Sequence, residues 1–257
     1  MKLYRRFLKK IIALILLKKQ RNIIGIPNEL RFGNHLYFFL HCYIENLEER
    51  PTMIAHTKAM DYWVKHFPNL KQFICYKKHF IDNFDWFTSY YQSFNIDFNL
   101  QQLNSFIKIY IDQPQFKSFN NFTINIRRGD FYVEGLNSPS TFDQVNYINK
   151  IVSNKKLNKN VEIISDDINW CKNNISLDNH DIKFFENKEP IEHFYQLSNS
   201  STLAVTNSTF SYWAGYISKY LSKNNIVFAP NFGATHYKDN IAIQLHPEWE
   251  IIDVINP

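Results

Sequence analysis

The sequence predicts an α/β protein whose C-terminal half is a parallel sheet covered by helices. Between residues 122 and 230, short apolar segments rich in β-branched residues alternate with longer segments that have a helical apolar pattern. This alternation is typical of βαβ units, in which crossover helices pack on a parallel sheet. The 257 residues, 45% of them hydrophobic and 17% aromatic, can bury a sizeable core and argue against disorder.

Each element of this half is bounded by a change in the apolar pattern. We expect strands at residues 122–126, 161–165, 182–185, 202–206 and 226–229. Helices are expected at 142–152, from 168 to 174, at 190–198 and from the 207–215 stretch to residue 220. A polar loop with Gly135, Asn137 and Pro139 precedes the first of these helices.

The N-terminal half begins with a strand, a loop and a helix. Residues 23–26 form the strand, the loop holds Gly33 and Asn34, and the helical pattern starts at Leu36. Residues 51–55 are the next expected strand, and residues 60–67 and 84–94 are expected helices. We place the boundary near Pro114, which divides the chain into residues 1–21, 22–118 and 119–257.

The first segment is strongly basic. Residues 1–22 hold eight of the chain's lysines and arginines and no acidic residue, so the rest is close to neutral although the net charge is +5. This distribution argues against nucleic-acid binding, which uses a basic face of the folded domain. The apolar run at 11–17 is too short to span a bilayer and lacks the features of a signal peptide. Two interpretations remain: a basic amphipathic helix on an anionic membrane surface, and an ordinary first helix packed on the body.

Cysteine usage points to a reducing compartment. Cys42, Cys75 and Cys171 are scattered, odd in number and without the spacing of metal ligands. A disulfide framework is therefore not expected, and a cytoplasmic protein is the simpler interpretation.

Polar clusters follow three of the expected strands. Because the carboxyl ends of parallel strands meet at one edge of a sheet, these clusters can converge on one crevice. They are Arg127-Arg128, Ser165-Asp166-Asp167 and Asn207-Ser208-Thr209.

Together the clusters have the chemistry of a nucleoside-diphosphate site. Arginines suit phosphate oxygens, carboxylates suit a guanine edge or ribose hydroxyls, and hydroxyls at a helix N-terminus suit phosphate. Each also has a simpler explanation: Asp166, Asp167 or Ser208 could cap a helix. No P-loop or dinucleotide-binding glycine motif is present. The two aspartates are adjacent, unlike the Asp-x-Asp pairs that hold metals, so no metal cofactor is expected.

The clusters resemble a known family. Residues 125–130, Asn-Ile-Arg-Arg-Gly-Asp, resemble the His-x-Arg-Arg-x-Asp motif of the α-1,2-fucosyltransferases of glycosyltransferase family 11. Residues 164–172 and 198–215 resemble the second and third motifs of its donor domain. Residues 30–36, Leu-Arg-Phe-Gly-Asn-His-Leu, resemble its Gly-Gly-Leu-Gly-Asn-Gln signature and equally the Arg-Phe-Gly-Asn stretch of protein O-fucosyltransferases.

The resemblance implies a GT-B-like fold, with two Rossmann-like domains facing a central cleft. Residues 22–118 would be the acceptor-side domain and residues 119–257 the GDP-sugar-binding domain. It implies an inverting, metal-independent transfer of fucose from GDP-fucose to a sugar hydroxyl, with α-1,2 linkage to galactose expected, in a bacterial surface glycan such as lipopolysaccharide. The acceptor could be lipid-linked, and residues 1–21 could hold the enzyme at the inner face of the membrane.

The resemblance also assigns roles to individual residues. Arg127 would hold the β-phosphate as charge develops on the leaving GDP, and Arg128 would be structural or secondary. Asp166 or Asp167 would read guanine. The remaining donor contacts would come from Gly33, Asn34, Asn125, Asp130, Asn207, Ser208 and Thr209.

Three departures from the family pattern put the acceptor and linkage in question. Asn125 stands in place of the family histidine, Leu30-Arg31 replace paired glycines, and His35 replaces glutamine. His35 is a candidate general base, as are Glu45, His56 and Asp61, although His35 could equally be a packed residue. Asp130 is expected to pair with an arginine. The rival functions are transfer with another GDP-sugar or acceptor, and a non-catalytic carbohydrate- or nucleotide-binding module.

Overall fold

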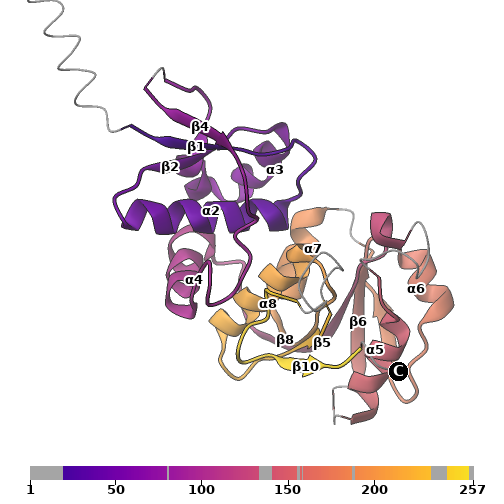
Figure 1. Ribbon diagram of the computed structural model, residues 1–257. Coiled ribbons are helices and arrows are strands. Elements are labelled where there is room, and N and C mark those ends of the chain that lie inside the picture. Colours follow the sequence, from indigo (N-terminus) through magenta and orange to yellow (C-terminus); the bar gives the residue numbers. More distant parts are fainter. Residues whose placement is uncertain are drawn as a thin grey trace, which may run out of the picture.

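The chain folds into two parallel β-sheets with associated helices, and this confirms the α/β, GT-B-like class (Figure 1). The computed structural model describes residues 20–79, 81–132, 141–154, 157, 159–186, 189–232 and 242–254. Residues 1–19, and with them most of the basic segment, lie outside the described part, as does the loop with Gly135, Asn137 and Pro139. No helix in the described ranges combines the length and the apolar character needed to cross a membrane.

The N-terminal sheet has four strands in the order β3-β2-β1-β4, all parallel. The strands are β1 (Asn22–Gly25), β2 (Thr52–Ala55), β3 (Ile74–Cys75) and β4 (Asn83–Trp86). Its helices are α2 (Phe32–Leu47), α3 (Lys58–His66) and the 3-10 helix η1 (Pro68–Phe73). The capped helix α4 (Leu100–Phe106) continues directly into the π-helix η2 (Ile107–Ile111).

The prediction of a helix at residues 84–94 is wrong. Asn83–Trp86 is strand β4, paired with the edge of β1, and the described residues that follow it up to 94 contain no helix. Phe84, Phe87 and Tyr91 have helix-like spacing, but a free strand edge offers the backbone a complete ladder of hydrogen bonds. The helix expected at 60–67 is confirmed as α3.

The C-terminal sheet has six parallel strands in the order β10-β9-β8-β5-β6-β7. The strands are β5 (Phe119–Ile126), β6 (Asn160–Ser165), β7 (Asp181–Phe184), β8 (Ser200–Ala204), β9 (Ile226–Pro230) and β10 (Glu250–Ile252). Helices α5 (Gln144–Asn154), α6 (Ile168–Asn174), α7 (Pro190–Ser198) and α8 (Thr209–Leu221) connect them, and η3 (Gly129–Tyr132) is a 3-10 turn after β5. The expected strands and helices are confirmed; strand β10 and the short turn η3 were not expected.

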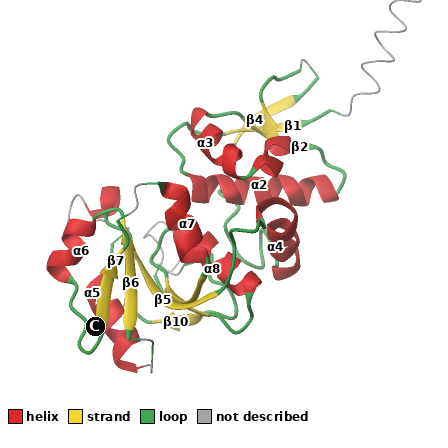
Figure 2. Cartoon of the chain, turned by 180° about the vertical axis from the view of Figure 1, so that it is seen from behind, coloured by secondary structure: helices red, strands yellow, loops and turns green. Residues whose placement is uncertain are grey.

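Helices α2 and α8 join the two sheets (Figure 2). The hydroxyls of Tyr37 and Tyr216 lie 3.0 Å apart in this contact. One hydrophobic cluster contains Ile24 and Ile54 of the first sheet and Leu203 and Val227 of the second. The loop after β1 therefore faces the carboxyl edge of the second sheet.

Candidate functional site

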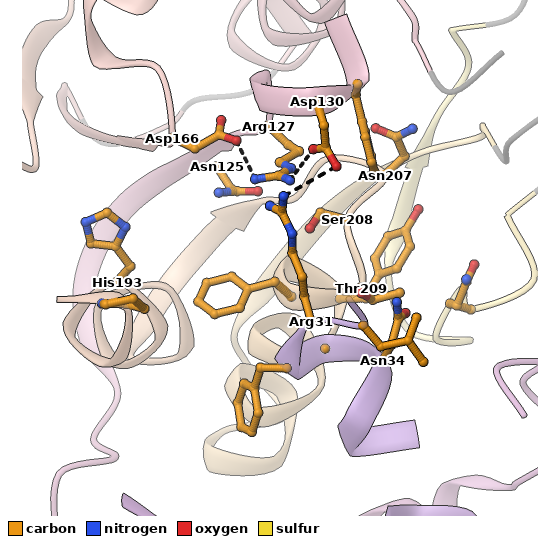
Figure 3. Close-up of a pocket in the computed structure, with 18 of the residues that line it drawn as sticks. Arg31, Asn34, Asn125, Arg127, Asp130, Asp166, His193, Asn207, Ser208 and Thr209 are labelled. Carbon is orange, nitrogen blue, oxygen red and sulfur yellow. Dashed lines mark hydrogen bonds and ion pairs between the residues drawn. The ribbon is translucent and has the colours of Figure 1, made fainter. Parts of the chain in front are cut away.

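A cavity of about 840 Å³ lies between the β1–α2 loop and the carboxyl ends of β5, β6 and β8 (Figure 3). The first half of the chain contributes the stretch from Asn28 to Asn34. The second half contributes residues that follow each of the three strands. The three polar clusters thus converge, as the parallel topology requires.

Arg127 is the less exposed of the two arginines in the cavity lining. Its guanidinium forms ion pairs with Asp166 and Asp130, and only 17% of the side chain is exposed. Gln144 donates a hydrogen bond of 2.8 Å to the Arg127 carbonyl, and the Phe131 ring lies 5.3 Å from the guanidinium carbon. An arginine fixed on both sides presents its donors with little further loss of side-chain entropy.

The turn after β5 allows this arrangement because residue 129 is glycine. Gly129 has φ +26°, and a Cβ there would lie 2.4 Å from Oδ2 of Asp166. The other oxygen of Asp166 accepts a hydrogen bond of 2.8 Å from the Arg128 backbone. A side chain at residue 129 would therefore displace the carboxylate that holds Arg127.

Two helix N-termini meet at the same cavity. Helix α2 starts at Phe32 and α8 at Thr209; neither Arg31 nor Ser208 caps its helix with a side-chain hydrogen bond, and neither first turn holds an acidic residue. A Cβ on Gly33 would lie 2.5 Å from the backbone of Thr209 and Phe210, so only glycine permits this approach. Free backbone N–H groups and two positive dipole ends favour an anion here.

Side-chain amides line another part of the wall. Oδ1 of Asn34 accepts a hydrogen bond of 3.0 Å from Gln92, and Oε1 of Gln92 accepts one of 2.7 Å from Gln244. Asn125 accepts a hydrogen bond of 3.0 Å from the Thr206 hydroxyl. Amides both donate and accept, so this wall has the chemistry needed to bind hydroxyls.

An aromatic wall, formed by Phe32, Trp63 and Phe210, completes the cavity. The Phe32 and Trp63 rings stack with centroids 3.7 Å apart, and Phe210 lies 6.2 Å from Trp63. The cavity therefore has a charged end and an apolar surface.

Most of the residues that the sequence suggested lie in the cavity lining. They are Gly33, Asn34, Asn125, Arg127, Asp130, Asp166, Asn207, Ser208 and Thr209. The structure does not bring Arg128, Asp167 or His35 to this lining.

Arg128 and Asp167 have structural contacts. The guanidinium of Arg128 lies between two rings, 3.8 Å from the centroids of both Tyr132 and Trp170. Oδ1 of Asp167 accepts a hydrogen bond of 3.0 Å from the backbone N–H of Trp170 and so caps α6. The capping explanation thus accounts for Asp167.

His35 is inside the protein. The residue is 1% exposed, its two ring nitrogens have no hydrogen-bond partner among the described residues, and burial lowers its pKa to about 4. The other candidate bases are also outside the lining: Glu45 pairs with Arg50, and His56 pairs with Asp61.

Sequence reasoning did not select several lining residues. Glu29 and His193 lie in the cavity and are not among the residues that pair with Arg127, so they are the new candidates for accepting a proton. Arg31 also reaches Asp130, at 3.4 Å. The loop after the first strand, which the sequence predicted to hold Gly33 and Asn34, was the available signal for Arg31 and Glu29. Gln92, His193 and Gln244 have no signal in the local sequence.

Two joined α/β units, with arginine, helix N-termini and side-chain amides lining the cavity between them, are typical of the nucleotide-sugar glycosyltransferase class. The family model described as "Glycosyl transferase family 11" matches residues 53–253. The chain belongs to this family.

A curated relative, the "Alpha-1,2-colitosyltransferase" of Escherichia coli, is 26% identical over 151 residues. The match covers 56% of this chain and 49% of that protein, so the chain spans about half the length of this relative.

Within the described ranges, no group of three or more His, Cys, Asp or Glu side chains could hold a metal ion. The three cysteines are buried and unpaired, and burial raises the pKa of the Cys171 thiol to about 11.

Proposed function

We propose that the protein is an inverting fucosyltransferase that uses GDP-fucose, requires no metal, and forms an α-1,2 linkage to a galactose of a bacterial surface glycan. The acceptor hydroxyl attacks C1 of fucose, the bond from C1 to the β-phosphate oxygen breaks, and its electron pair leaves with GDP. The hydroxyl proton passes to a base at the cavity wall.

The observation that carries this proposal is the position of Arg127 at the end of β5, beside the N-terminus of α8. Its forked donors and the free N–H groups of the helix would stabilise the charge that develops on the leaving diphosphate. Such stabilisation is the electrostatic function of a divalent cation in other transferases, which is why none is required here.

Phosphate binding would change one contact of Arg127. Asp130, whose side chain is 55% exposed, can leave the guanidinium at small cost, whereas Asp166 is less exposed and is held by the Arg128 backbone. Arg31, which also pairs with Asp130, would then be available to the same phosphate. Asp166 would continue to orient Arg127.

The apolar part of the cavity suits a deoxy sugar. The methyl group of fucose could pack on Phe32, Trp63 or Phe210, while Gln92 and Gln244 bind ring hydroxyls. A sugar with a hydroxyl at that carbon would lose solvation there without gaining a partner. We therefore place the donor sugar between the aromatic and the amide walls.

A second candidate function is colitosyl transfer, which the E. coli relative favours by name. Colitose is fucose without the 3-hydroxyl, so both sugars would present the same methyl group to the aromatic wall. The ratio of kcat/KM for GDP-fucose and GDP-colitose distinguishes the two candidates.

Titration calorimetry in EDTA with GDP and GDP-fucose tests the donor site. Wild type should bind both nucleotides, and Arg127→Ala should weaken binding at least tenfold and lower kcat by about 100-fold or more. Lys117→Ala, an exposed lysine outside the cavity, is the control. Absence of nucleotide binding by the folded wild type would favour the non-catalytic carbohydrate-binding module instead.

A further inference from the structure

The N-terminal sheet has one face that no helix in the described ranges covers. Ile24 and Ile54 point into the hydrophobic cluster that contains α2. Phe84 and Trp86 belong to the opposite face, because they pair with Ile23 and Gly25, the neighbours of Ile24. A parallel sheet normally has both faces covered.

A short connection crosses this second face. Strands β3 and β4 are the two edges of the sheet, so the connection between them, of which residues 76–79 and 81–82 are described, crosses one of its faces. Arg21 contacts Sδ of Met53 at 3.2 Å and pairs with Asp82 of the connection. Met53 pairs with Ile23, so the connection lies on the same side as Phe84 and Trp86.

The connection leaves aromatic rings and cations exposed. Trp86 is 64% exposed and Phe84 39%, and their rings cover Gly25. Lys77 and Lys78 are exposed, and Nζ of Lys78 lies 5.0 Å from the Phe84 ring centroid. We call these four residues the outer face: Lys77, Lys78, Phe84 and Trp86.

The outer face lies beside the point where the basic segment joins the fold. β1 follows residues 1–19, which carry seven lysines and arginines and no acidic residue. In Figure 1, β1 and β4 lie on the side of α2 away from the C-terminal sheet, and none of the four outer-face residues belongs to the cavity lining. Arg21, the next cation, is already paired with Asp82.

We propose that the outer face docks on an anionic phospholipid surface. Tryptophan and phenylalanine partition into the headgroup region of a bilayer, and neighbouring lysines attract anionic lipids. A second copy of the chain would bring these lysines close to identical cations, which disfavours a symmetric dimer through this face. The proposal concerns residues outside the cavity lining and does not depend on which sugar is transferred.

Sedimentation with vesicles tests the proposal on the full chain. Wild type should bind vesicles of phosphatidylcholine with 30% phosphatidylglycerol, in a salt-sensitive manner, and bind phosphatidylcholine alone weakly. Lys77→Ala/Lys78→Ala should reduce the partition coefficient about tenfold or more, since each lysine near an anionic surface contributes about fivefold. Lys117→Ala/Lys223→Ala removes two exposed lysines elsewhere and should bind like wild type.

Trp86 provides a second, spectroscopic readout. Lipids brominated in the acyl chain should quench part of the tryptophan fluorescence in wild type, and Trp86→Phe should lose that part while GDP binding is retained. Failure of wild type to bind anionic vesicles would overturn the proposal. Equal vesicle binding by wild type and the Lys77/Lys78 variant, or unchanged quenching in Trp86→Phe, would overturn it too. A dimer that wild type forms and the Lys77/Lys78 variant does not form would also overturn it.

Discussion

The contrast between Asn34 and His35 shows what a motif does and does not predict about single residues. Both follow Gly33 at the start of α2, yet Asn34 lines the cavity and His35 is buried. Consecutive residues of a helix point about 100° apart, so a helix that packs against the body on one side sends them to different environments. The motif predicted that this stretch lies at the site. Which of its side chains faces the cavity depends on the rotation of α2 about its own axis, and only the packed structure shows that rotation.

His35 should make the protein less stable in mild acid. Its folded pKa, about 4, is below the unfolded value near 6.5, so the unfolded chain binds more protons between these values. The contribution of His35 to the free energy of unfolding is fully present above pH 6.5 and is lost as the pH falls toward 4. Between pH 7 and pH 5 this loss is about 2 kcal/mol.

Urea unfolding of wild type and His35→Leu at pH 7 and pH 5 measures this effect. The variant should lose less stability than wild type over this interval, because leucine does not titrate and fills a similar buried volume. The same measurement on His41→Gln gives a comparison with a second buried histidine, because burial lowers the pKa of His41 as well. Equal pH dependence in wild type and His35→Leu would contradict the assignment.

Glu29 is the residue that we expect to take the proton from the attacking hydroxyl of the acceptor sugar. It lies on the β1–α2 loop, across the cavity from the strand end that carries Arg127, and inversion places the attacking hydroxyl opposite the leaving group. Glu29→Gln should lower kcat about 100-fold or more and leave GDP binding near that of wild type. His193→Gln is the matched test; a larger loss of kcat in that variant would assign the role to the imidazole.

At the scale of elements, the sequence pattern predicted the strands whose positions depend only on the burial of apolar side chains. Strands β5, β6, β8 and β9 each contain a buried stretch with apolar residues, which the sequence pattern reveals. Strand β3 has two residues and β10 three, too few for any period to be recognised. The four residues of β4 are all exposed and are fixed by pairing with β1, a long-range contact that local pattern does not encode.

The contact between α2 and α8 depends on Gly33. A Cβ there would approach the backbone of Thr209 and Phe210 to 2.5 Å, and backbone cannot rotate away as a side chain can. Gly33→Ala should therefore separate two helix N-termini, destabilise the protein by about 2 kcal/mol and weaken GDP binding.

Gly25→Ala is the matched control for that variant. Its Cβ would meet the Phe84 ring at 2.7 Å, and this ring is partly exposed and can move. Chemical unfolding should show a smaller loss of stability, with GDP affinity unchanged. A Gly33→Ala protein with wild-type stability and affinity would show that the close approach is not required.

At the scale of the whole molecule, the two sheets share one core. The cluster that contains Ile24 and Ile54 also contains Leu203 and Val227, and Trp213 lies 5.1 Å from Tyr37 across the α2–α8 contact. Separating the halves would expose these rings and the paired hydroxyls of Tyr37 and Tyr216. The cavity therefore lies at the edge of a continuous core.

A shared core predicts that the protein unfolds as one cooperative unit. Calorimetry should give a single transition with equal calorimetric and van't Hoff enthalpies, and GDP should shift it to higher temperature as a whole. Residues 119–257 alone should not fold, because Trp213 and Tyr216 would lose their covering helix. Two separate transitions, with GDP moving only one of them, would instead show that the C-terminal sheet is stable and binds nucleotide independently of α2.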